Sequence, residues 1–232
     1  MPEARARFQD ELRHLEEQAL EGLDMVVEAL DRALEALQHQ DVELASLVIA
    51  DDDRIDGRYL EVHQGLLSLM ALQAPVATDL RLVASLLHVI KHIERMGDQC
   101  VNICKLIPLS GHDAPADAEL VARIEKMGEL VRSQVTQARQ AYSLRDVALA
   151  EDLVRQDMEV NRLNRECFAR ALAIGDDPDT REWASYMMLV ARSLERICDN
   201  AVDIGEQTAF VVTGLFREFT DASHPEPVSP GP

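Results

Sequence analysis

Apolar residues recur every three or four positions along most of the chain, the spacing that places them on one face of an α-helix. One such stripe is formed by Leu12, Leu15, Ala19, Leu23, Val26, Leu30, Leu34 and Leu37. Another is formed by Leu82, Leu86, Ile90, Ile93, Gly97 and Val101. Aromatic residues make up only 4% of the chain and β-branched runs are few, which argues against a β-sandwich or barrel. The pattern therefore predicts an all-α protein.

Prolines and capping residues divide this pattern into segments. A proline inside a helix costs about 3 kcal/mol and restricts the residue before it. The prolines that interrupt the pattern are Pro75, Pro108, Pro115 and Pro178. Asp41 and Asp146 each follow a polar turn and are suited to cap a helix N-terminus. We therefore expect six long helices, at residues 4–38, 41–72, 76–107, 116–143, 146–173 and 179–219.

The two halves of the chain resemble each other. Residues 91–104 align without gaps on residues 192–205, with five identities and five close substitutions. Residues 41–56 align on residues 146–161 at a similar offset, so the repeat is about 100 residues long. Short connections make sequential helices antiparallel neighbours. The expected fold is thus two tandem antiparallel three-helix bundles related by an internal repeat.

We place the first bundle at residues 1–110, the second at 111–219 and a disordered proline-rich tail at 220–232. The chain carries 42 acidic against 23 basic residues, a net charge of −19, which disfavours binding to nucleic acid. Its N-terminus is charged, and no run approaches the roughly 20 apolar residues of a membrane span. We therefore expect a cytoplasmic protein that reaches a membrane only through its partners.

The four cysteines form no disulfide-scaffold or CxxC pattern, so we interpret them as reduced thiols. Cys100 and Cys104 lie one helical turn apart and could bind a metal together, but we favour small hydrophobic residues on a buried helix face. His88 and His92 have the same spacing, and for them we favour packing or surface roles.

Acidic residues repeat at i, i+4 on helices that follow each other in the chain. The first half has Asp52, Asp56, Glu94 and Asp98; the second has Asp157, Asn161, Glu195 and Asp199, extended by Asp203. Two carboxylates at this spacing repel each other by about a few tenths of a kcal/mol. Their repetition therefore calls for a stabilising reason.

Hairpin geometry supplies one. Positions 54 and 96 lie equally far from Pro75, and positions 159 and 197 lie equally far from Pro178. Each antiparallel hairpin should therefore bring its acidic pairs to one level, about 30 Å from the turn. Oxygen-rich clusters on facing helices are typical of cation sites in helical bundles. The alternatives are a solvated acidic face and salt bridges to Arg95 and Arg196.

No Ser/His/Asp or Cys/His set, Walker loop or Rossmann fingerprint is present in the sequence. A two-carboxylate acid–base enzyme is conceivable, but a duplicated site without an evident substrate pocket argues against it. We expect no enzymatic activity.

Two segments resemble the signature of the PhoU family, the accessory regulators of phosphate-specific transport. The first is ALQAPVATDLRLVASLLHVIKHIERMGDQCVNI at 71–103, and the second is LVARSLERICDNAVDIGE with the following TAFVVTG at 189–214. The resemblance covers about residues 5–218. It implies two tandem three-helix bundles and E(D)xxxD motifs that bind iron, zinc or other metals in multinuclear clusters on the protein surface. The matching positions are Asp52, Asp56, Glu94 and Asp98, then Asp157, Glu195 and Asp199.

The same resemblance implies a negative regulator of the phosphate-starvation response. Its expected partners are a sensor histidine kinase and the ATP-binding subunit of a phosphate ABC importer, with a homodimer as the expected assembly. A metal-storage bundle of the ferritin-like kind is one alternative, although it requires Glu-x-x-His ligands that are missing from 91–104 and 192–205. A structural helical interaction module with fortuitous acids is another.

The chain departs from the family pattern in its second half. Asn161 stands where a second acid would complete the motif, Cys198 replaces the usual glycine, and Asp203 occupies a position often filled by asparagine. Asp203 is therefore a candidate substitute ligand, and weaker metal binding at the second site is the alternative. Asp79 and Arg81 have no counterpart pair in the second half, and helix-start capping is the simpler interpretation of Asp79.

Overall fold

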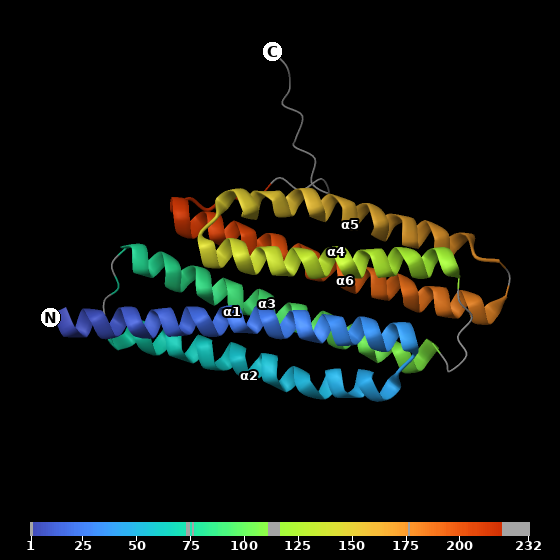
Figure 1. Cartoon of the computed structure of the whole chain (residues 1–232), viewed down its shortest axis with the longest axis horizontal. Helices are drawn as coiled ribbons and strands as arrows, with labels where there is room; N and C mark the ends of the chain where they lie inside the picture. The colour runs from blue at the N-terminus through green and yellow to red at the C-terminus, as the bar shows by residue number, and fades with distance from the viewer. Residues whose placement is uncertain (1, 73–74, 76, 111–116, 176, 220–232) are drawn as a thin grey trace, which may run out of the picture.

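The computed structural model describes residues 2–72, 75, 77–110, 117–175 and 177–219, and every regular element in these ranges is helical (Figure 1). The predicted tail at 220–232 lies outside the described residues. The elements are α1 (Pro2–His39), α2 (Val42–Leu72), α3 (Ala77–Leu106), the 3₁₀ turn η1 (Ile107–Ser110), α4 (Ala118–Leu144), α5 (Val147–Ala173) and α6 (Pro178–Thr213). The six predicted long helices are therefore confirmed.

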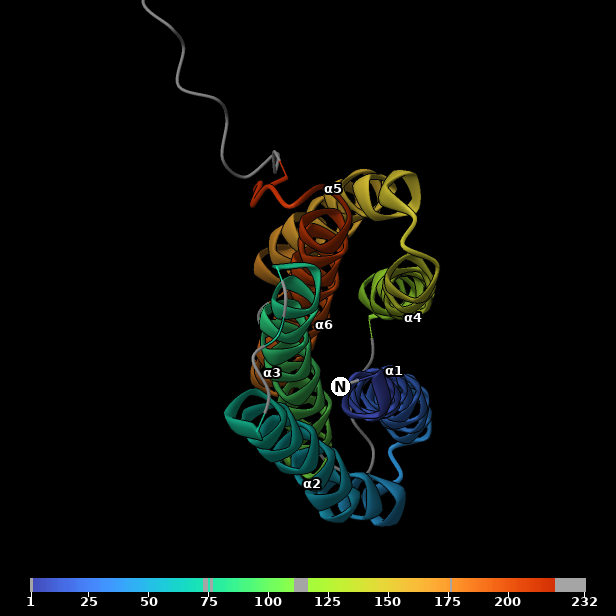
Figure 2. The same cartoon turned by 90° about the vertical axis from the view of Figure 1, so that its left-hand side faces the viewer.

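The helices form two bundles that lie side by side (Figure 2). Helices α1, α2 and α3 make the first bundle, and α4, α5 and α6 make the second. The bundles meet along two seams, α3 against α6 and α1 against α4. Helices α2 and α5 lie at opposite ends of the molecule in this view. Each bundle therefore uses two of its helices to contact the other.

Local capping explains most helix boundaries. The Asp41 side chain accepts a hydrogen bond from the Leu44 N–H (2.9 Å), and the Asp146 side chain accepts one from the Leu149 N–H (3.1 Å). Both predicted N-caps are confirmed. The predicted end of the last helix at residue 219 is wrong. Gly214 adopts a left-handed conformation (φ 74°) and closes α6 at Thr213, a conformation that glycine adopts without steric cost.

One continuous apolar core runs through both bundles and includes most of the predicted stripe residues. Leu23, Val26 and Leu30 of α1 are fully buried, and so is Leu86 of α3. All four cysteines are free and buried, which confirms the packing interpretation of Cys100 and Cys104. Within the described residues, none of the helices has the length and apolar character that crossing a bilayer requires.

Candidate functional site

The four acidic residues of the first half meet on the hairpin of α2 and α3. The pKa of Asp52 is raised to about 6, first by burial and then by the charges of Asp56, Asp98, Asp53 and Glu94. Burial and the charges of Glu94 and Asp56 likewise raise the pKa of Asp98. These mutual effects require the carboxylates to lie close to one another. The hairpin symmetry about Pro75 thus predicts their meeting correctly.

Gly97 makes room for this cluster, which we call the first acidic site (Asp52, Asp56, Glu94, Asp98). A Cβ atom at Gly97 would lie only 2.8 Å from the Asp52 Oδ1 atom. The only cation that pairs with the site at close range among the described residues is Lys91, whose Nζ lies 2.7 Å from the Glu94 Oε2. The site therefore keeps a net excess of negative charge.

The second half places its acids in a different environment, the second acidic site (Asp157, Glu195, Asp199). The Asn161 Nδ2 donates a hydrogen bond to the Asp157 Oδ2 (2.7 Å). The Arg192 guanidinium pairs with both carboxylate oxygens of Glu195. Asp157 and Glu195 are both buried. In the second acidic site an amide and a guanidinium therefore contact the carboxylates, whereas the corresponding carboxylates of the first acidic site lie mainly beside other acids.

Cys198 fills the space that Gly97 leaves open in the first half. Its pKa lies well above the ordinary range because the thiol is buried and because Asp157 lies beside it as a charge and a hydrogen-bond partner. The thiol also donates a hydrogen bond to the Gln134 Oε1 of α4. The position between α5 and α6 that corresponds to the glycine gap is thus occupied by a neutral side chain.

Asp203 takes part in a different contact. Its Oδ2 lies 3.3 Å from the Nδ1 of His92 on α3, and the same nitrogen lies 2.8 Å from the Asn200 Oδ1. Eight residues beyond Glu195, Asp203 is rotated by about 80° from it around the helix, and this rotation turns it towards the first bundle. His92 therefore has a packing role at the α3–α6 seam, as predicted, and the contacts of Asp203 lie at that seam.

Asp79 contacts another helix. It accepts a hydrogen bond from the Gln9 Nε2 (3.0 Å) and pairs with the Arg5 Nη1 (2.6 Å), both on α1. The carboxylate lies in the first turn of α3. These two contacts of Asp79 thus link the start of α3 to α1.

Both acidic sites use donors that suit hard cations, because their ligands would be carboxylate oxygens. Among the described residues, no three side chains of Asp, Glu, His or Cys are arranged to hold one metal ion. The first acidic site fits a cation better by its chemistry, since it gathers four acids against one lysine. A bound cation there would relieve repulsion that the second acidic site relieves with its own side chains.

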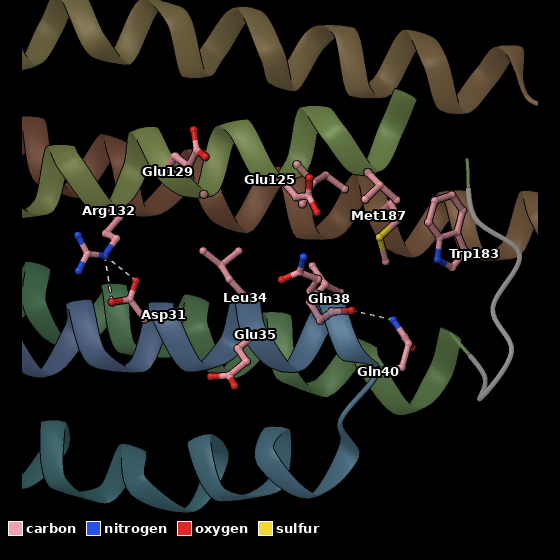
Figure 3. A pocket seen from close by; sticks show the side chains of 14 residues that line it. Asp31, Leu34, Glu35, Gln38, Gln40, Glu125, Glu129, Arg132, Trp183 and Met187 are labelled. Atoms are coloured by element: carbon pink, nitrogen blue, oxygen red, sulfur yellow. Dashed lines mark hydrogen bonds and ion pairs between the residues drawn. The ribbon is translucent and has the colours of Figure 1, made fainter. Parts of the chain in front are cut away.

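The sequence interpretation missed the cations next to the motif glutamates. Lys91 and Arg192 occupy equivalent repeat positions, three residues before Glu94 and Glu195. The repeat alignment contains this signal, because a basic residue is kept at the same place in both halves. It also missed a pocket between α1 and α4 (Figure 3), because no local motif marks it.

Two tandem three-helix bundles, each with a hairpin that carries a group of acidic side chains, define the class: a duplicated helical protein with paired carboxylate sites. The family model described as "PhoU domain" matches residues 20–107 and 124–208, one stretch in each bundle. The chain belongs to the PhoU family.

Named relatives match nearly the whole chain. A phosphate-specific transport system accessory protein PhoU homolog of Clostridium acetobutylicum is 30% identical over 92% of this chain and 98% of its own length. A homolog with the same description from Deinococcus radiodurans is 33% identical over 90% of this chain and 98% of its own length.

Solved structures agree on the fold. The phosphate transport system regulatory protein PhoU from Streptococcus pneumoniae superposes with a TM-score of 0.84 at 25% identity, covering 90% of this chain and 99% of that one. PhoU from Pseudomonas aeruginosa gives a TM-score of 0.82 at 25% identity, covering 90% of this chain and all of that one.

Proposed function

We propose that this protein is a non-enzymatic negative regulator of the phosphate-starvation response. One observation carries the proposal: both bundles match the PhoU domain, and relatives named as accessory proteins of phosphate-specific transport align over nearly their full length. In this role the protein acts in the cytoplasm as a homodimer. It contacts a sensor histidine kinase and the ATP-binding subunit of a phosphate importer, and it lowers kinase output when phosphate is plentiful.

Deletion of the gene in its own host tests this proposal. We expect a reporter of a phosphate-starvation promoter to be active in both high and low phosphate, because repression is lost. Reintroduction of the intact gene should restore repression in high phosphate. A reporter that still responds normally to phosphate in the deletion strain would refute the regulatory role.

We also propose that the first acidic site holds metal ions, iron or zinc, in a multinuclear cluster. Asp52, Asp56, Glu94 and Asp98 would supply oxygen ligands, and the ions would supply positive charge on the surface of the bundle. Asp157, Glu195 and Asp199 would bind cations more weakly, because Arg192, Asn161 and Cys198 already occupy their surroundings. This asymmetry is supported by the different neighbours of the two sites.

The asymmetry predicts that the second acidic site can be strengthened by copying the first. In an Asp52→Asn, Asp98→Asn background, the further changes Asn161→Asp and Cys198→Gly should raise the affinity for Mn²⁺ or Zn²⁺ about tenfold. Asn161→Asp supplies a further carboxylate ligand, and Cys198→Gly reopens the gap beside Asp157. Calorimetric titration measures the affinity. Cys167→Gly, at another buried cysteine of the same bundle, is the control and should leave the cation affinity unchanged. If it raises the affinity as much as Asn161→Asp with Cys198→Gly does, the proposed asymmetry of the two acidic sites is wrong.

A further inference from the structure

A cavity lies away from both acidic sites, where α1 and α4 face each other (Figure 3). It has a volume of about 850 Å³ and continues down to α6 between the two bundles. We call it the α1–α4 pocket. Its lining runs from Asp31 on α1 to Gln40, directly after the end of that helix, and from Val121 to Arg132 on α4. At 1.5 Å per residue these spans correspond to about 14–16 Å, or between two and three turns of a helix.

The inner wall of the pocket is apolar. Its apolar residues are Leu34, Leu37, Val121, Ile124, Trp183 and Met187. Leu34 and Leu37 are only partly buried, although the earlier residues of the same stripe on α1 are covered by the core. Leu34 reaches across to Gly128 of α4, where a Cβ atom would come within 2.7 Å of the Leu34 Cδ1. The two helices therefore touch at this point and leave apolar surface open beside it.

The rim of the pocket is acidic. Four carboxylates line it, and they belong to Asp31, Glu35, Glu125 and Glu129. Arg132 is the single cation of the lining, and its Nε lies 2.7 Å from the Asp31 Oδ1, so that the pair bridges α4 and α1. Glu129 also lies 3.2 Å from the exposed Lys126 Nζ. Glu35, Glu125 and Glu129 are exposed. An apolar wall between acidic edges complements an apolar stripe between basic edges.

We propose that the α1–α4 pocket binds a basic amphipathic helix of a partner protein. Apolar side chains at i, i+3 or i+4, and i+7 of that helix span two turns and match the length of the wall. Lysine or arginine side chains on both flanks of the stripe meet the glutamates of α1 and α4, which gives orientation and speeds association. The net charge of −19 adds attraction for such a partner at longer range.

Charge disfavours the two occupants that this chain could supply itself. A second copy would bring its own excess of acids against an acidic rim. The residues that follow 219 include Asp221 and Glu226 and no lysine or arginine. Phe219, the last described residue, contacts the α5–α6 side of the second bundle, where its Cε2 lies 3.2 Å from the Cβ position of Gly205. The rim therefore selects a basic segment from another protein.

The assignment gives the proposed regulator a surface for a protein partner, but it rests on the shape and charge of the pocket and not on the regulatory role. The binding test below uses purified protein and needs no phosphate response, so that either conclusion can fail without the other. Trp183 provides the signal, because it is the only tryptophan of the chain and it lines the pocket.

The probe is a synthetic 14-residue helical peptide without tryptophan, with leucines at i, i+3, i+7 and i+10 and lysine or arginine on both flanks. We expect it to change the Trp183 fluorescence and to bind in calorimetry. A peptide with glutamate in place of the basic residues, and one of the same composition in scrambled order, should each bind at least tenfold more weakly. Equal binding of the scrambled peptide, or of spermidine, would overturn the proposal, because charge alone would then explain it.

Variants locate the binding surface. Glu125→Lys with Glu129→Lys should weaken peptide binding tenfold or more, and Gln38→Phe should do so by filling the pocket. Glu17→Lys with Glu151→Lys changes the net charge by the same amount at exposed positions elsewhere and should leave binding unchanged. If both charge-reversal pairs have the same effect, or if Glu125→Lys with Glu129→Lys changes only self-association in sedimentation, the pocket does not bind a partner helix.

Discussion

Replacement of Asp52 by asparagine is expected to stabilise the metal-free protein at neutral pH and to remove most of its stabilisation by divalent cations. The pKa of Asp52 is raised to about 6 by burial and by the charges of Asp56, Asp98, Asp53 and Glu94. A carboxyl group whose folded pKa is raised favours folding most at low pH, and this advantage is lost as the pH rises through the folded pKa. Above about pH 6, ionised Asp52 therefore opposes folding.

Asparagine keeps the shape of the side chain and removes this charge. We expect a gain of about 1–2 kcal/mol at pH 7.5, after allowance for partial solvent screening, which corresponds to about 2–8 °C in melting temperature. The gain should disappear near pH 4, where aspartate is itself largely neutral. Thermal melts at both pH values, in the presence of a chelator, measure it.

The same variant should lose about a hundredfold in affinity for Mn²⁺ or Zn²⁺ because a neutral amide, with a single oxygen, replaces a charged carboxylate ligand. Asp53→Asn is the matched control: it makes the same charge change at an exposed neighbouring position of α2. It should have only a small effect on melting and on cation affinity. A variant at position 52 that binds cations as tightly as the original protein would remove Asp52 from the metal site.

Replacement of Gly205 by valine is expected to destabilise the protein by about 3 kcal/mol, or about 6–12 °C in melting temperature. A Cβ atom at this position would lie 2.8 Å from the Leu153 Cδ1 and 3.1 Å from the carbonyl oxygen of Ala150. Leu153 is fully buried and the Ala150 oxygen belongs to the backbone of α5, so neither can move cheaply. Relief requires α5 and α6 to separate.

Gly57 provides the comparison within the same chain. It also lies inside a helix, but a Cβ atom there meets nothing within 4 Å. Gly57→Ala should therefore stabilise α2 by about 0.5–1 kcal/mol, because alanine restricts the unfolded chain and favours helix. Chemical denaturation of both variants measures the two effects. Destabilisation by both substitutions to the same extent would show that helix packing at Gly205 is not the cause.

Local patterns in the sequence are sufficient to predict the helices and their order. Apolar spacing places Leu23 and Leu30 in the core, and the capping aspartates Asp41 and Asp146 set two helix starts, because these effects act over a few residues. The last helix was predicted six residues too long. Its end depends on the backbone conformation of Gly214, which the apolar pattern does not contain.

The acidic sites were predictable to the extent that hairpin symmetry governs them. An antiparallel turn at Pro75 brings Asp52 level with the motif acids of α3, and this register does not depend on how the other helices pack. The different chemistry of the second acidic site was visible only in part, through Asn161 and Cys198. That Gln134 of α4 accepts a hydrogen bond from Cys198, and that Asp203 pairs with His92, follows from contacts between helices far apart in the chain.

The sequence by itself thus determined the all-α fold class, the duplication and the residues that meet across each hairpin. All of these depend on periodicity and on distance from a turn. Only the tertiary structure decided how the two bundles join. The α3–α6 and α1–α4 seams bring together residues more than 80 positions apart, such as Leu34 and Gly128. The α1–α4 pocket exists because the two bundles approach at that pair and diverge beside it, which no single helix encodes.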